Sequence, residues 1–171
     1  MRSGSSNSLL EQLENFALDV AVICQRKRWP RTLQELKHFE DAFTIIVPDT
    51  EDSSDAQWPK RQLRTLDKAN WLFIDQQTET GKQLHRWLAT NGLPIEPSIE
   101  VDNFDLIVNL VALGIGVSVV PRRVLPLYAH QRKVRRLPLK PIFSREISLV
   151  VRKSAKLDPH VRGFIDQLLF S

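Results

Sequence analysis

Short apolar runs alternate with stretches of helical periodicity along the whole chain. Most of these runs show no alternation of polar and apolar residues, which is typical of strands whose two faces are both covered. The pattern therefore predicts an α/β protein with largely parallel sheets and helices on each side. The expected strands are residues 20–24, 43–47, 71–74, 117–120 and 147–151.

Capping residues and apolar side chains three and four positions apart predict four helices between these strands. The first opens at Ser8, with Glu11 as a possible capping-box partner, and ends near Asn15. The other three are bounded as follows: Thr78 or Glu79 to Asn91-Gly92, Asp102 or Asn103 to Gly114, and Asp158, with Pro159 in the first turn, through Leu169.

Composition narrows the class of protein. The chain has 171 residues, 42% hydrophobic and 26% charged, which is ordinary for a folded domain and excludes a disordered chain. A single cysteine, Cys24, cannot form an internal disulfide. No apolar run approaches the roughly 20 residues of a membrane span, and the start lacks a signal-peptide core. A cytoplasmic protein without a membrane partner is expected.

Reactive residues do not converge in the sequence. The four histidines are scattered without partners at metal-ligand spacing. Gly114-Ile115-Gly116 follows a helix and precedes a strand, the reverse of a dinucleotide-binding turn. We therefore predict no catalytic residues, no metal site, no cofactor and no enzymatic activity.

Two polar turns are better candidates for binding. Asp75, Gln76, Gln77 and Thr78 follow the run at 71–74, and Asp102 and Asn103 follow Val101; each turn leads into a helix. Ligands of open α/β sheets bind outside the carboxyl ends of strands, where helix N-termini offer N–H groups to anions. Thr78 and Asn103 are also ordinary cap residues, so capping alone is the competing interpretation.

Four basic clusters, at 26–31, 60–64, 122–123 and 132–136, accompany a net charge of +4. A nucleic-acid-binding module is one hypothesis. The clusters fall at strand ends and loops without a known nucleic-acid-binding signature, which favours solvated loops or a basic rim near a cleft for an anionic ligand.

The order of elements resembles the effector-binding domain of LysR-type transcriptional regulators. The segments that carry the resemblance are GSSNSLLEQLENFALDVAVI, FEDAFTIIVPD, KANWLFID, IEVDNFDLIVNLVALGIGVSVVPRRVL and REISLVVRK. The resemblance implies a periplasmic-binding-protein type 2 fold with two lobes, residues 1–48 with 122–171 and residues 49–121. It also implies a small, anionic effector in the cleft between the lobes.

Site residues follow from the same resemblance. Matched positions for effector contacts are Gln76, Gln77, Thr78, Asp102, Asn103 and Phe104, with Cys24 and Gln25 near the hinge and Pro121 at the return crossing.

The chain also departs from the family pattern. Family members begin with a helix-turn-helix domain, and their first lobe begins with a strand-helix-strand unit; neither precedes GSSNSLLEQL here, so the first lobe is expected to be incomplete. The resemblance implies a homo-oligomer that contacts DNA only through the helix-turn-helix domain. A truncated paralogue acting only by protein–protein interaction remains an alternative.

Overall fold

A computed structural model describes residues 2, 4–26, 28–49, 66, 69–93, 95–127, 133–154 and 156–167. The chain separates into two compact units: unit 1 is Met1–Glu40 with Arg145–Ser171, and unit 2 is Asp41–Ser144. These units change over at 40/41 and 144/145, whereas the sequence placed lobe boundaries at 48/49 and 121/122. The difference arises because residues 41–48 and the described residues 122–127 and 133–144 group with the middle of the chain, through pairs such as Phe43 with Phe143 at 4.7 Å between ring centroids.

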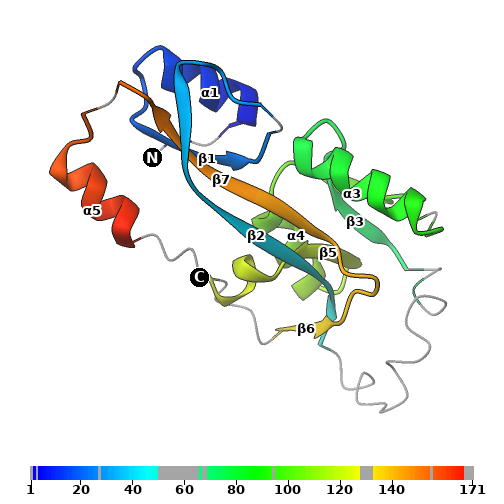
Figure 1. Ribbon diagram of the computed structural model, residues 1–171. Helices are drawn as coiled ribbons and strands as arrows, with labels where there is room; N and C mark the ends of the chain where they lie inside the picture. The colour runs from blue at the N-terminus through cyan, green and yellow to red at the C-terminus, as the bar shows by residue number, and fades with distance from the viewer. Residues whose placement is uncertain are drawn as a thin grey trace. The chain divides into compact units, whose positions relative to one another are not determined.

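Unit 1 is a small sheet with a helix on each face (Figure 1). Its strand β1 pairs antiparallel with β7, and β7 neighbours β2. Ala21 and Val150 pack against α1, while Leu149 and Val151 pack on the α5 side, so alternate side chains of one strand face different helices. The elements of this unit are α1 (Ser6–Glu14), β1 (Val20–Cys24), the first part of β2 (Leu33–Pro48), β7 (Ser144–Arg152) and α5 (Pro159–Gln167).

Unit 2 is a sheet in the order β4-β3-β5-β2-β6. Strand β3 runs parallel to β4 and β5, whereas β2 runs antiparallel to β5 and β6. Phe73 faces the apolar cluster that holds α3, and Leu72 faces the cluster that holds α4, so the two helices cover opposite faces. The elements are the rest of β2, β3 (Trp71–Ile74), α3 (Glu79–Thr90), β4 (Ile99–Val101), α4 (Phe104–Ala112), β5 (Val117–Pro121), the 3-10 helix η2 (Arg122–Leu127) and β6 (Val134–Leu137).

The α/β class and all five expected strands are confirmed. The expectation of largely parallel sheets is wrong, because β1–β7, β2–β5 and β2–β6 are antiparallel. A strand covered on both faces reads as the same apolar run in either direction, so the run carries no information on strand polarity. The pattern also missed β4, β6 and the first part of β2, where most side chains are polar or exposed.

The helix boundaries follow their caps closely. Thr78 and Asn103 cap α3 and α4 as predicted, and α5 begins at Pro159. The start of α1 differs: Ser5 is its cap, with Oγ accepting from Ser8 N at 3.3 Å, so Ser8 lies inside the first turn. Leu168 and Leu169 of the predicted last helix lie outside the described residues. Across the described ranges, no helix is long and apolar enough to cross a membrane.

A buried arginine holds unit 1 together. Arg152 on β7 is only 8% exposed, and its Nη1 donates to the backbone oxygens of Leu13, at 2.7 Å, and Leu18. Its Nη2 lies 3.4 Å from Asp19 Oδ1, and its guanidinium stacks 4.5 Å above the Phe16 ring. One side chain therefore satisfies carbonyls at the end of α1 and in the following turn, which ties both to the sheet.

Replacing this arginine should destabilise the fold. Arg152→Ala removes the guanidinium donor from the Leu13 and Leu18 oxygens, and we expect a loss of about 2–3 kcal/mol in the free energy of unfolding, measured by urea denaturation. Lys153→Ala, which removes an exposed cation one residue further on, is the matched control and should change it by less than about 0.5 kcal/mol. Equal effects of the two substitutions would contradict the anchoring role of Arg152.

Candidate functional site

Three strands of unit 2 end at one edge of the sheet. Ile74 at the end of β3 lies opposite Val101 at the end of parallel β4, and Asp75 N donates to Val101 O at 2.8 Å. Strand β5 is parallel to β3 as well, so Pro121 at its end reaches the same edge. We call residues 75–78, 102–104 and 121 the polar edge. The sequence-predicted contacts in unit 2 therefore do come from neighbouring strand ends.

The first turn of the polar edge is organised by Asp75. Its Oδ1 accepts from Gln77 N at 2.7 Å, and its backbone oxygen accepts from Thr78 N at 3.0 Å and from Thr78 Oγ1 at 2.7 Å. Thr78 Oγ1 in turn accepts from Gly81 N at 2.9 Å and so caps α3. The turn is thus fixed by its own backbone and capping bonds.

The side-chain amides of the two glutamines in this turn are not used in that network. Gln76 is half-buried and Gln77 is exposed. Among the described residues, no hydrogen bond engages either side-chain amide. Each amide offers one acceptor oxygen and two donor protons, so both remain available to a polar ligand.

The second turn is capped by Asn103. Its Oδ1 accepts from Leu106 N at 2.8 Å, and its Nδ2 donates to Asp102 Oδ1 at 2.7 Å. Both Asp102 and Asn103 are exposed. The amide bond to Asp102 uses one of that carboxylate's oxygens and fixes the orientation of the two side chains relative to each other.

Two helices begin at the polar edge. The first N–H groups of a helix have no acceptor within it, and the helix dipole places partial positive charge at that end. Helix α3 begins after Thr78 and helix α4 begins after Asn103. The strands that lead into these two turns, β3 and β4, are neighbours in the sheet. Glu79 and Asp105 stand in the two first turns and already complement the dipoles. The edge therefore combines amide donors with carboxylate acceptors.

Phe104 and Pro121 serve mainly in packing. The Phe104 ring meets the Phe43 ring edge-on at 6.0 Å between centroids and packs against the apolar clusters on both faces of the sheet. Pro121 is buried and lies opposite Phe43 in the β2–β5 ladder. Both residues therefore belong to the apolar packing of unit 2 next to the polar turns.

Cys24 and Gln25 belong to unit 1. Cys24 is buried at the end of β1, opposite Ile147, and Gln25 N extends the ladder by donating to Glu146 O at 2.8 Å. Gln25 presents an exposed side chain. Their part in effector binding stays a prediction.

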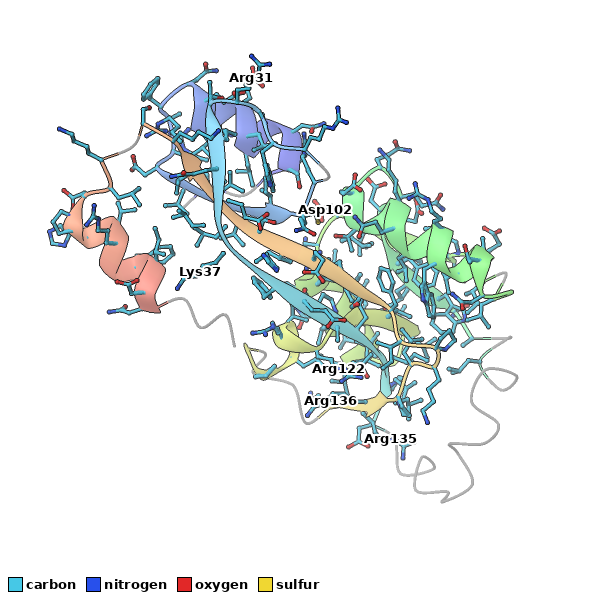
Figure 2. The ribbon with its side chains drawn as sticks, in the orientation of Figure 1. Arg31, Lys37, Asp102, Arg122, Arg135 and Arg136 are labelled. Carbon is cyan, nitrogen blue, oxygen red and sulfur yellow. The ribbon has the colours of Figure 1, made fainter. Side chains whose placement is uncertain are left out.

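The basic clusters are divided between the units. Arg122, Arg135 and Arg136 adjoin β2 in unit 2, where Arg122 Nε donates to Phe43 O at 3.3 Å and Arg136 lies opposite Ile46 (Figure 2). The described residues of cluster 26–31 belong to unit 1. Cluster 60–64 and residues 27 and 132 lie outside the described residues.

No group of three or more potential metal ligands occurs in the part of the chain that the structure describes. Two of the histidines have other neighbours. His85 faces the Phe73 ring edge-on at 5.6 Å between centroids, and His38 Nδ1 lies 3.0 Å from Glu35 Oε1.

Asp75 belongs to the polar turn predicted from the sequence, although it is not among the positions matched to family contacts. Gly81, which also organises the polar edge, was not predicted. It could have been found as a glycine in the first turn of a helix, because glycine has a low helix propensity and usually stands in a helix for a steric or functional reason. That reason is steric: a Cβ on Gly81 would lie 2.1 Å from the Asp75 oxygen.

Gly81→Ala should therefore distort the first turn of the polar edge. We expect it to lower the free energy of unfolding by about 1–3 kcal/mol in urea denaturation, because the overlapping atom is backbone and cannot rotate away. Gly163→Ala in α5 is the control, since no atom lies within 4 Å of the place its methyl group would take, and it should stabilise by up to about 1 kcal/mol. A neutral Gly81→Ala would show that α3 does not approach Asp75 this closely.

Comparison with known proteins identifies the family. The LysR substrate binding domain model matches residues 1–170. Among curated proteins, the chain is 23% identical over 171 residues to an uncharacterized HTH-type transcriptional regulator, YusT of Bacillus subtilis (strain 168). The match covers 97% of this chain and 53% of YusT, so the chain spans about half the length of that relative.

Solved structures show the same fold. The effector binding domain of QuiR in complex with shikimate superposes with a TM-score of 0.66 at 20% identity, covering 95% of this chain and 76% of that one. The CcmR regulatory domain of Synechocystis PCC6803 in complex with 2-PG gives a TM-score of 0.70 at 13% identity, covering 95% and 77%. Both have the periplasmic-binding-protein type 2 fold expected for this chain. The chain belongs to the LysR substrate-binding domain family.

Proposed function

We propose that this chain senses a small anionic effector at the polar edge and thereby controls DNA binding by the intact regulator, through a helix-turn-helix domain outside these residues. The observation that carries the proposal is the convergence of two helix N-termini and two uncommitted glutamine amides at one edge of the unit 2 sheet. The family is a regulatory one.

The argument for an anionic group on the effector comes from backbone N–H groups more than from charged side chains. Helix N-termini bind carboxylates and phosphates through N–H groups without needing a paired cation. The two aspartates of the turns, Asp75 and Asp102, each use one oxygen for a donor of the edge itself. Their remaining oxygens can accept from hydroxyl groups. An effector that carries one acidic group and several hydroxyls fits this mixture.

The ligands of two structural relatives support a small-molecule effector. The QuiR effector binding domain is in complex with shikimate and the CcmR regulatory domain with 2-PG, both small molecules. The expectation that the effector lies between two lobes, contacted by Cys24 and Gln25 from the other side, stays a prediction.

Control of DNA binding requires two arrangements of the regulator with different affinities for the effector. An effector shifts such an equilibrium only by its differential affinity for the two states. LysR-type regulators act as oligomers, and we propose that this chain forms a homo-oligomer, in which a shift at each effector site changes the spacing of the attached DNA-binding domains.

A thermal-shift screen tests the proposed ligand class. Small organic acids and phosphates, each paired with its neutral amide or ester, are added to the folded chain. A ligand at 100 times its Kd stabilises by about 2.7 kcal/mol, and each kcal/mol raises Tm by about 2–4 °C for a chain of this size. We expect an acid to raise Tm while its neutral partner does not. Stabilisation by neutral compounds alone would contradict an anionic effector.

Adding one negative charge at the polar edge tests whether the acid binds there. Asn103→Asp keeps a side-chain oxygen that can cap α4, but it replaces the amide donor to Asp102 with a second carboxylate at the polar edge. The added negative charge should weaken binding of an acid found in the screen by about tenfold, measured by calorimetry. Asn109→Asp makes the same change at an exposed position further along α4 and should leave affinity within about twofold. Equal affinities of both variants and the wild type would place the acid elsewhere.

A further inference from the structure

We propose that unit 2 carries a second binding surface, which takes the phosphate backbone of duplex DNA. Its residues are Arg122, Lys133 and Arg136, and we call them the basic end. The proposal goes beyond the proposed function, in which DNA is bound through a helix-turn-helix domain outside these residues. It adds a direct contact between the effector-binding chain and DNA, and it can fail without affecting effector binding.

Positive and negative charges are unevenly divided along the sequence. From Leu106 to Arg145 the chain contains eight Arg and Lys residues and neither Asp nor Glu. Since the whole chain has a net charge of +4, this segment of +8 leaves −4 for all the other residues together. A segment of one sign in an otherwise acidic chain is typical of a surface that binds a polyanion.

The structure places three cations of this segment along β2 and the residue after it. Their partners stand three residues apart: Arg122 Nε donates to Phe43 O at 3.3 Å, Arg136 lies opposite Ile46, and Lys133 O accepts from Asp49 N at 2.9 Å. A strand rises about 3.3 Å per residue, so these positions span about 20 Å. The basic end is therefore a row of cations rather than a single point.

The basic end lies away from the carboxylates of the polar edge. Strand β6 stands at one end of the strand order of unit 2, whereas Asp75 and Asp102 follow β3 and β4 at the other end. Four steps of about 4.8 Å separate β4 from β6, which is more than twice the Debye length of about 8 Å at physiological ionic strength. Figure 2 shows Arg122 and Arg136 well apart from Asp102. The polar edge therefore does not neutralise these cations.

The side chains of the basic end are exposed and available to an anion. Within the described ranges, neither the Lys133 ammonium nor the Arg136 guanidinium has a hydrogen-bond or ion-pair partner, and Arg122 uses only its Nε. The exposed Asp49 offsets one of the three positive charges, so the net charge of this end stays positive.

The chemistry and the length of the row both fit a DNA backbone. Guanidinium groups bind phosphate oxygens through two parallel N–H donors. Each strand of a duplex carries one phosphate per roughly 3.4 Å of helix axis, so a row of about 20 Å faces about six phosphates of one strand. In the intact regulator proposed above, the bound DNA-binding domain holds DNA near this chain, which favours DNA over an acidic peptide as the partner.

The proposal is tested by fluorescence anisotropy of a labelled mixed-sequence duplex with the full chain, over a range of salt concentrations. We expect log K to fall linearly with log[salt] with a slope of about −3, because each neutralised phosphate contributes about −0.9. Arg122→Ala combined with Arg136→Ala should reduce the slope to about −1 and weaken low-salt binding by at least about tenfold.

A second double variant controls for net charge. Lys82→Ala combined with Arg86→Ala also removes two exposed cations from unit 2, but from α3. It should leave the affinity for the duplex within about twofold of the wild type, because these residues lie outside the basic end. Circular dichroism and urea denaturation establish that both double variants are folded.

Three outcomes would overturn the proposal. They are a folded wild type without salt-dependent binding to the duplex, equal losses of affinity in the two double variants, and polyglutamate that competes as strongly as unlabelled DNA. The last result would assign the surface to an acidic protein.

The thermal-shift screen, repeated on Arg122→Ala with Arg136→Ala, separates this proposal from the sensing function. We expect this variant to respond to the same acids as the wild type. Duplex binding by a wild type that responds to no acid would refute only the sensing function, whereas an acid response without duplex binding would refute only the basic end.

Discussion

The parallel pairing of β3 with β4 and β5 is the constraint on which the candidate site depends. Parallel strands end at the same edge, so the turns after β3 and β4 and the end of β5 meet although they are separated by tens of residues in the chain. The bond from Asp75 N to Val101 O fixes the relative position of the two turns. Everything proposed for effector binding follows from that shared edge, because neither turn alone offers more than a capped helix.

The two units use polar side chains in different ways. In unit 1, Arg152 bonds carbonyls at the end of α1 and in the turn that follows, and so stabilises a small sheet with few strands. In unit 2, Thr78 and Asn103 satisfy helix N-termini and leave the backbone amides of the first turns directed at the edge. The first arrangement serves stability. The second holds donors in place for a ligand before the ligand arrives, which lowers the ordering cost of binding.

Much of this architecture was predictable from local signals. The five buried strands, the caps at Thr78 and Asn103 and the glycine stops, with Gly114 at a φ of 78°, could be predicted because each depends on neighbouring residues. Strand polarity could not, since a run such as FTIIV is equally compatible with parallel and antiparallel neighbours. The β6 strand was missed because VRRL shows neither alternation nor a continuous apolar run.

The candidate site also combines features that could be predicted from neighbouring residues with features that could not. The polar turns at Gln76–Gln77 and Asp102–Asn103 were predictable from their place after strands. The distance between Gly81 and the Asp75 backbone oxygen was not, because it depends on the conformation of the turn that joins them. The most direct measurement of the central claim is an ¹H–¹⁵N NMR titration of the folded chain with acids from the screen. Saturable shifts concentrated in the amides of residues 76–80 and 102–106 are the predicted result. Saturable shifts confined to other segments would contradict it.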